Sequence, residues 1–308
     1  MYASLLPFFA IVGLGYFAGR IKLISSEGVN GINSFVLYFA MPALTLNVLT
    51  KLPIEEFFEW RFMASYGATS LTVFFAMVVF QRLVLKTDAK LSAVRAVCVA
   101  WANAVYMGLP IMLVIHGEKG LIIPMWTIVI DMMVTATIAI IFLEVAQSQT
   151  TSVTAILRKI ARGLYTNLFF ISFLACFAIV LFKIPIPVSI ANLADFLADA
   201  AAPTALFAIG AGLATHKIEG SNRELAAFSI LKFILAPAVA AFFAYIVFDL
   251  PGWLAMSTVI LSCLPVAGNC FIIAKRYNSG VATSSALILI TTVLSMPVLA
   301  GLVWWYGL

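Results

Sequence analysis

Charged residues are scarce in this sequence. Only 10% of its 308 residues are Asp, Glu, Lys or Arg, whereas 64% are hydrophobic, and the mean hydropathy is +1.11. A soluble domain of this size would be about a quarter charged. The composition excludes an ordinary soluble protein and indicates a helical protein that crosses the membrane several times. A closed β-barrel is excluded too, because its strands would alternate apolar and polar residues instead of forming long apolar runs.

Motifs for catalysis, ATP hydrolysis and metal binding are missing as well. The sequence has no Walker motif, no HExxH and no GxSxG. Its cysteines lie in apolar runs without CxxC or Cys/His spacing, so we expect small core residues at Cys98, Cys176, Cys263 and Cys270. We therefore expect no enzyme, no cofactor, no metal site and no direct use of ATP.

Ten apolar runs of about 20 residues, the length of a transmembrane helix, follow one another along the chain. They lie at residues 3–19, 31–50, 61–85, 93–116, 119–145, 164–183, 189–215, 223–248, 253–277 and 281–306. The predicted fold class is an all-α integral membrane protein with ten transmembrane helices. The longest connection, residues 147–163, is predicted to be a basic loop that carries Arg158, Lys159 and Arg162.

The 18 Lys and Arg residues are distributed unevenly between the two sides of these spans. Most fall in the odd-numbered loops: Arg20, Lys22, Arg82, Lys86, Lys90, Arg95, Arg158, Lys159, Arg162, Lys217, Arg223, Lys275 and Arg276. Because positive residues are retained on the cytoplasmic side, both termini are predicted to face outside. The net charge of +5 is thus a signal of orientation in the plasma (inner) membrane, and we expect no nucleic acid partner.

Two spans contain helix-interrupting residues near their middle. Such residues weaken a helix or leave its backbone groups without hydrogen-bond partners. They are Asn103, Gly108 and Pro110 in the fourth span, and Pro265, Gly268 and Asn269 in the ninth. Pro and Gly also make simple packing kinks in membrane helices. These two spans, however, occupy matching places in two halves of five. With an odd number of spans in each half, the second half crosses the membrane in the opposite orientation to the first. This predicts inverted repeats at residues 1–150 and 151–308, the plan of secondary transporters.

Interrupted spans expose N–H and C=O groups that lipid cannot satisfy, whereas a water-filled cavity or a substrate can. The start of a half-helix also carries partial positive charge, which suits an anionic group. We therefore predict substrate binding by Asn103, Tyr106, Gly268 and Asn269 at the breaks, and by Asn47, which follows Pro42 in the second span. The helix breaks are assigned to Gly108, Pro110 and Pro265.

The interrupted segments resemble a known family. "NAVYMGLPIMLVIHGEKG" and "LPVAGNCFIIAKRYN" are similar to the fourth-span and ninth-span signatures of the auxin efflux carrier family. The resemblance implies the fold of the PIN carriers and bile acid sodium symporters, in which two broken helices cross at mid-membrane. It also implies a scaffold domain (spans 1, 2, 6 and 7) and a transport domain (spans 3–5 and 8–10) that moves against it as an elevator. PIN-type members have Pro-Asn at the fourth-span break, whereas this chain has Ala102-Asn103, which suggests a gentler bend or a break nearer Gly108.

Two charged residues lie near the middle of predicted spans, where a charge costs several kcal/mol unless it has a partner or faces a cavity. They are Asp131 and Lys232, and the resemblance would place both in the transport domain. One interpretation is a structural ion pair; the other is coupling or charge compensation during transport. Asp195 and Asp199 share a helix face near Pro203, for which we expect a role in an outer vestibule or at a helix start, with direct contact to substrate as the alternative.

The function predicted from these features is secondary active transport of a small organic anion, such as a mono- or dicarboxylate or an auxin-like acid. Coupling to protons or to the membrane potential is favoured. A sodium-coupled symporter of the bile acid type, and a channel or receptor on the same fold, are the alternatives. The expected partners are the substrate, protons or Na⁺, and the lipid bilayer. The oligomeric state stays open, with a homodimer among the options.

Overall fold

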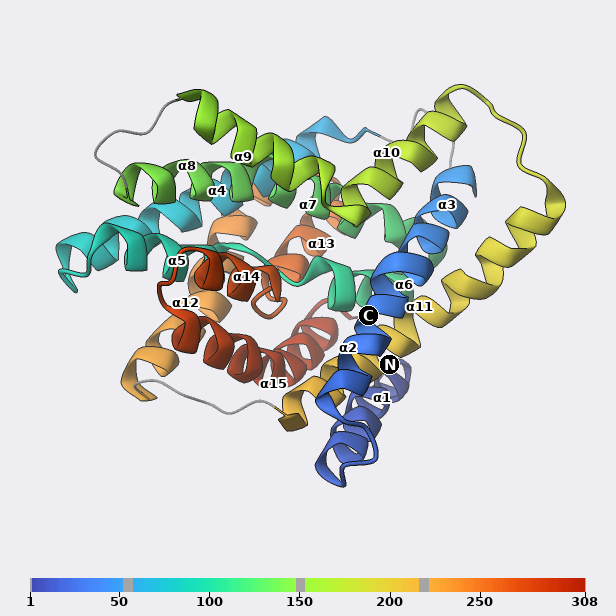
Figure 1. The fold of residues 1–308 in the computed structure, drawn as a ribbon, viewed down its shortest axis with the longest axis horizontal. Coiled ribbons are helices and arrows are strands. Elements are labelled where there is room, and N and C mark those ends of the chain that lie inside the picture. The colour runs from blue at the N-terminus through green and yellow to red at the C-terminus, as the bar shows by residue number, and fades with distance from the viewer. Residues whose placement is uncertain (1, 52–57, 148–152, 216–221, 308) are drawn as a thin grey trace. The chain divides into compact units, whose positions relative to one another are not determined.

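The computed structural model describes residues 2–51, 58–147, 153–215 and 222–307, and all regular secondary structure in these ranges is helical. The elements are α1 (Tyr2–Arg20), α2 (Ser26–Phe35), η1 (Val36–Ala40), α3 (Met41–Lys51), α4 (Trp60–Leu83), α5 (Ala89–Ala100), η3 (Ala104–Gly108), α6 (Leu109–His116), η4 (Gly117–Leu121), α7 (Ile122–Ile130), η5 (Asp131–Thr135), α8 (Ala136–Gln147), α9 (Val153–Tyr165), α10 (Leu168–Leu181), α11 (Val188–Thr215), α12 (Asn222–Ala241), η6 (Phe242–Val247), α13 (Gly252–Ser262), α14 (Asn269–Arg276) and α15 (Val281–Trp305) (Figure 1). The predicted all-helical class is confirmed. Lys217 lies outside the described residues.

Six helical segments in the described ranges are long and apolar enough to cross a membrane. They are Ser26–Lys51, Trp60–Leu83, Ala104–Gln147, Val188–Ala214, Arg223–Val247 and Val281–Trp305. The bent pair formed by α9 and α10 adds a seventh if it is one span. Several membrane-spanning helices are therefore present, while the number ten and the inverted repeat stay predictions.

The predicted basic loop at residues 147–163 is wrong in part, because α9 (Val153–Tyr165) occupies much of it. Apolar residues recur in this segment at helical spacing, but its basic residues led to the prediction of a loop. Arg158 and Arg162 are exposed one turn apart, and the half-buried Ile156 and Ile160 repeat at the same interval on another face.

The chain divides into two compact units, each of which is assembled from separate segments. Unit 1 consists of Met1–Glu59, Val105–Met125 and Gly163–His216, and unit 2 of Trp60–Ala104, Trp126–Arg162 and Lys217–Leu308. The assignment of whole spans to a scaffold and a transport domain stays a prediction.

In unit 1, α1 packs along α11, and α3 packs against both α11 and α10 (Figure 1). The first pair is close because glycines lie at the contact. A Cβ atom at Gly15 would overlap the backbone carbonyl of Phe207, and one at Gly210 would overlap that of Val12. Small residues of this kind allow membrane helices to approach closely.

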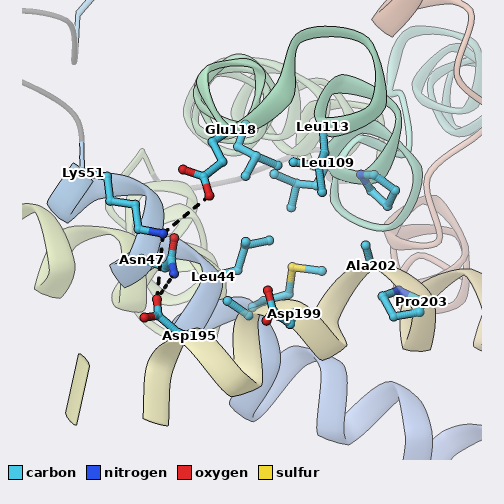
Figure 2. A pocket seen from close by; sticks show the side chains of 14 residues that line it. Leu44, Asn47, Lys51, Leu109, Leu113, Glu118, Asp195, Asp199, Ala202 and Pro203 are labelled. Carbon is cyan, nitrogen blue, oxygen red and sulfur yellow. Dashed lines mark hydrogen bonds and ion pairs between the residues drawn. The ribbon is translucent and has the colours of Figure 1, made fainter. Parts of the chain in front are cut away.

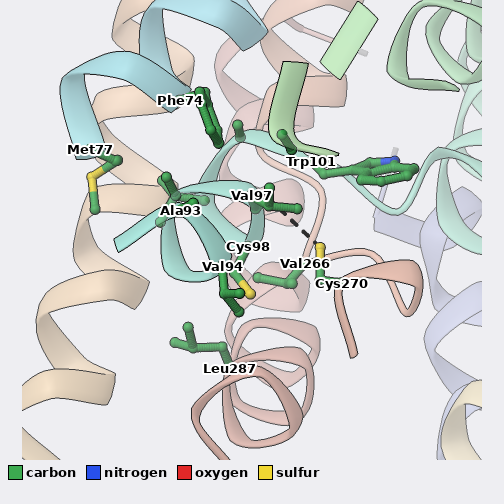
Figure 3. Close-up of a cluster of buried hydrophobic side chains, with 14 of the residues drawn as sticks. Phe74, Met77, Ala93, Val94, Val97, Cys98, Trp101, Val266, Cys270 and Leu287 are labelled. Atoms are coloured by element: carbon green, nitrogen blue, oxygen red, sulfur yellow. Dashed lines mark hydrogen bonds between the residues drawn. The ribbon is translucent and has the colours of Figure 1, made fainter. Parts of the chain in front are cut away.

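In unit 2, α4 packs on α5, and α12 packs on α13, α15 and α4. The core of this unit is a cluster of buried apolar side chains around α5, and α14 and α15 both contact that helix. Figure 3 shows Val97, Cys98 and Trp101 of this segment beside Val266 and Cys270. This core includes Trp101 and Val266, which lie at the two interruptions.

Candidate functional site

Both interrupted spans lose their helical conformation within unit 2. The helix of the fourth span stops at Ala100, residues 101–103 are not helical, and η3 begins at Ala104. In the ninth span, α13 ends at Ser262, residues 263–268 are not helical, and α14 begins at Asn269. Each break is therefore followed at once by the start of a new helix.

The two breaks are paired with each other through their backbones. Ala102 and Val266 form an isolated antiparallel bridge. The amide of Asn103 donates to the carbonyl of Pro265 at 2.9 Å, and the amide of Ala267 donates to the carbonyl of Trp101 at 3.2 Å. We call residues 101–103 and 263–268 the crossing. Since lipid offers no hydrogen-bond partners, this pairing allows two extended segments to lie inside a membrane protein.

A side chain completes this backbone pairing. The Val266 amide donates to the hydroxyl of Thr291 on α15 at 3.0 Å, and that hydroxyl donates to the Leu287 carbonyl at 2.6 Å. Thr291 and Val266 are both buried. The hydroxyl thus satisfies an amide that a helix would otherwise satisfy, and it holds the ninth-span break against α15.

The location of the fourth-span break differs from the expectation that the missing proline suggested. Gly108 ends η3 in helical conformation, and Pro110 lies in the first turn of α6, where its lack of an amide proton costs little. The residues that leave the helix are 101–103, directly at Asn103. Pro265 lies within the ninth-span break, where it cannot donate and disfavours helix for the preceding residue. The fourth-span break thus contains no proline of its own and is hydrogen-bonded to the break that contains Pro265.

The predicted binding residues are divided between the two units. Asn103 and Asn269 are partly buried at the starts of the two half-helices, and Gly268 is exposed beside Asn269. Tyr106 lies in η3 and belongs to unit 1, as does Asn47 on α3. The structure brings Asn103 and Pro265 together at the crossing. The binding role of all these residues stays a prediction.

Asp131 is fully buried in unit 2, at the start of η5. Its carboxylate accepts a hydrogen bond from the hydroxyl of Tyr66 at 3.2 Å and another from that of Thr135 at 3.2 Å. The Thr135 hydroxyl also lies 2.7 Å from that of Ser70. These partners were not predicted from sequence; the available signal is that Tyr66 and Ser70 lie about one turn apart on α4.

Lys232 is also fully buried in unit 2, on α12. Its ammonium donates to the backbone carbonyl of Val99 at 3.0 Å. Among the described residues, the ion pairs do not include Asp131 with Lys232. The structural ion pair was one of the two interpretations from sequence, and this arrangement does not provide it.

Unit 1 contains a cavity of about 470 Å³. Figure 2 shows its polar residues on three sides: Asn47 and Lys51 on α3, Glu118 on η4, and Asp195 and Asp199 on α11. We call this cavity the pocket. The common face expected for Asp195 and Asp199 is confirmed, because both line it.

The charges of the pocket are linked to one another. The Lys51 ammonium lies 3.6 Å from a Glu118 carboxylate oxygen and 3.9 Å from one of Asp195. The side-chain amide of Asn47 also donates to Asp195. Asn47 was predicted from sequence, whereas Lys51 and Glu118 were not, because both are charged residues at the ends of predicted spans, where charges are common.

The pocket also has an apolar wall, formed by Met41, Leu44, Leu109, Pro110 and Leu113. Leu109 and Pro110 come from the first turn of α6, so the helical half after the fourth-span break contributes to this cavity. A space of this size with apolar walls and a few polar groups is typical of a small-molecule site.

Comparison with known proteins identifies the family of this chain. Residues 1–303 match the family model described as "Membrane transport protein". A Rhizobium meliloti protein named "Putative malonate transporter" is 29% identical over 97% of this chain and 93% of its own length. An Escherichia coli protein named "Uncharacterized transporter YfdV" is 27% identical over 98% of this chain and 96% of its own length. The mouse "Lysosomal cholesterol signaling protein" is 26% identical over 99% of this chain, which spans 37% of that protein.

The sequence resemblance and the family match agree along nearly the whole length of the chain, and several helices are apolar and long enough to cross a membrane. The predicted family is confirmed. The chain belongs to the auxin efflux carrier family of membrane transport proteins.

Proposed function

We propose that this membrane transporter carries a small organic anion, a mono- or dicarboxylate of the malonate class or an auxin-like acid, by secondary active transport. The observation that supports this most is the crossing, at which two paired breaks are each followed by the start of a helix. Each start contributes about half a positive charge. The relative named as a malonate transporter supports a carboxylate among anions.

The proposed binding residues are those that flank the two helix starts. Asn103 and Asn269 offer side-chain amides, and Gly268 leaves room for a ligand to approach the backbone before α14. In unit 1, Tyr106 offers a ring face and a hydroxyl, and Asn47 is proposed to bind substrate in the pocket. Amide and backbone N–H donors are suited to a carboxylate, because a charged acceptor strengthens each hydrogen bond.

The proposed mechanism is alternating access of the elevator type. Ten spans in two inverted repeats would form a scaffold domain (spans 1, 2, 6 and 7) and a transport domain (spans 3–5 and 8–10), with both termini outside the inner membrane. Asp131 is the proposed coupling group, since a buried carboxylate that binds a proton loses its charge before it moves. Coupling to protons or to the membrane potential is therefore proposed over coupling to Na⁺.

The test is counterflow of radiolabelled malonate in proteoliposomes that contain the purified protein. Matched acid, amide and ester competitors should be ranked with the acid first, because only the carboxylate gains from the helix starts. Equal inhibition by all three would overturn the anion assignment. Imposed pH gradients, Na⁺ gradients and potassium diffusion potentials then separate proton, sodium and potential coupling. An unsaturable, ohmic current would instead support a channel.

A further inference from the structure

The fourth-span break removes the helical hydrogen-bond donor of the Val99 carbonyl. In a continuous helix the Asn103 amide would donate to the Val99 carbonyl, four residues earlier. At the crossing that amide donates to Pro265 instead, at 2.9 Å. The ammonium of Lys232 occupies the vacated position, 3.0 Å from the Val99 oxygen. A side chain from α12 thus replaces the hydrogen bond that the break removes from α5.

The end of a half-helix is also an electrostatic site. The last carbonyls of a helix carry about half a negative charge, and buried cations are stabilised near them. In transporters with interrupted helices, such carbonyls and helix ends coordinate the coupling cation. At the end of α5 the cation is supplied by the chain itself.

The Lys232 ammonium is buried at the end of α5, so its hydrogen-bond partner is a protein carbonyl instead of water. Lys232 is 1% exposed, and Val99 is likewise buried. The carboxylate of Asp131, also buried in unit 2, accepts from Tyr66 and Thr135, and the ion pairs among the described residues do not join it to Lys232. The contact that the structure gives the ammonium is therefore the Val99 carbonyl at the end of α5.

We infer that Lys232 is a built-in cation that takes the place of an alkali ion at the fourth-span break. As a positioning residue it fixes the crossing, and it makes transport independent of Na⁺. The expected effect of Lys232 on transport rests on the proposed carboxylate transport, whereas the cation site itself does not. The proposed substrate and the cation site can therefore be tested separately.

The first experiment compares wild-type and Lys232→Ala protein in vesicles that contain Na⁺, K⁺ or a large impermeant organic cation. Wild-type counterflow should be the same in all three. Lys232→Ala should lose transport by at least about tenfold, because a hydrogen bond from a charged group is removed inside the membrane. Methylammonium should restore a measurable part of that loss by occupying the vacated space. Strict Na⁺ dependence of the wild type would overturn the inference.

The second readout does not need transport. The melting temperature of detergent-solubilised Lys232→Ala should rise with methylammonium or an alkali ion, whereas that of the wild type should not. Lys275→Ala is the matched control, since Lys275 is an exposed lysine on α14 and its removal creates no cation space. No cation effect on folded Lys232→Ala would overturn the inference even if malonate transport is found. A cation effect without carboxylate transport would uphold the site and overturn the proposed substrate.

Lys232→Gln covers the case in which the alanine variant does not fold. Glutamine can donate to the Val99 carbonyl but brings no charge. If this variant keeps wild-type transport and stability, the role is hydrogen bonding alone, and the built-in cation is wrong. A folded glutamine variant with at least about tenfold lower transport would support the need for the charge.

Discussion

The polar groups of unit 2 and those of the pocket in unit 1 are satisfied in different ways. In unit 2, Asp131 and Lys232 are 0% and 1% exposed and bind hydroxyl groups and a backbone carbonyl. In the pocket, the side chains of Lys51, Asp195 and Glu118 are 48%, 53% and 71% exposed and pair with one another.

The difference predicts where a substitution will be costly. Removal of a buried partner leaves a desolvated group without compensation, whereas an exposed pair exchanges its partner for water and is worth about 1 kcal/mol or less. Salt also screens exposed pairs, because the Debye length is about 8 Å at physiological ionic strength. We therefore expect effects in unit 2 to be large and insensitive to salt, and effects in the pocket to be smaller and salt-dependent.

The strongest test of this comparison is Asp131→Asn. The amide keeps the size of the side chain but cannot carry a proton, so proton-driven transport should fall by about 100-fold or more. The protein should remain folded, because the amide oxygen still accepts from one of the two hydroxyl groups and the amide nitrogen can donate to the other. Uptake driven by an imposed pH gradient is the measurement.

Asp195→Asn provides the contrast, since it neutralises an exposed carboxylate of the pocket. It should retain most of the gradient-driven uptake. If Asp131→Asn transports normally with unchanged pH dependence, then Asp131 has no coupling role. The expected ranking of the buried and exposed groups would also be wrong.

The next largest effect is expected from Asn269→Ala and Asn103→Ala. If each amide donates to a bound carboxylate, its loss should weaken malonate binding by roughly 10- to 100-fold. Competition binding at 50 and 500 mM salt should give similar factors for both variants, because both asparagines are partly buried. Asn192→Ala is the matched control for the loss of an asparagine side chain, because Asn192 is exposed on α11. Unchanged affinity in both test variants would remove the crossing from the substrate site.

A smaller, structural effect is expected from Thr291→Val, which leaves the Val266 amide without its acceptor. A buried polar group that loses its partner costs about 1–3 kcal/mol, so the melting temperature should fall. Thr292→Val is the control, because that hydroxyl donates only within its own helix, to Ile288. Equal melting temperatures for the two variants would show that the break does not depend on α15.

Sequence analysis predicted the helical class, the family and the segments in which the helices are interrupted. These follow from local chemistry, since proline and glycine act on the residues beside them. It could not place the fourth-span opening at residues 101–103, because that opening depends on hydrogen bonds to Pro265 and Ala267 far along the chain. The partners of Asp131 and Lys232 were missed for the same reason. Such partners are determined by packing between helices, and one sequence contains no record of which helices meet.

The smallest effects are expected in the pocket. Glu118→Gln removes one of the two carboxylates near Lys51, so the ammonium should become more available and anion binding should strengthen slightly. Lys51→Gln should weaken it by a similar factor. Because exposed pairs contribute about 0.2–1 kcal/mol, each change should be less than about sixfold and should shrink at high salt. Titration of malonate at 50 and 500 mM salt is the measurement, with Lys119→Gln, a neighbouring exposed lysine outside the lining, as control. A salt-independent loss of tenfold or more in Lys51→Gln would show that Lys51 contacts the substrate directly, and the contrast between the two regions would then fail.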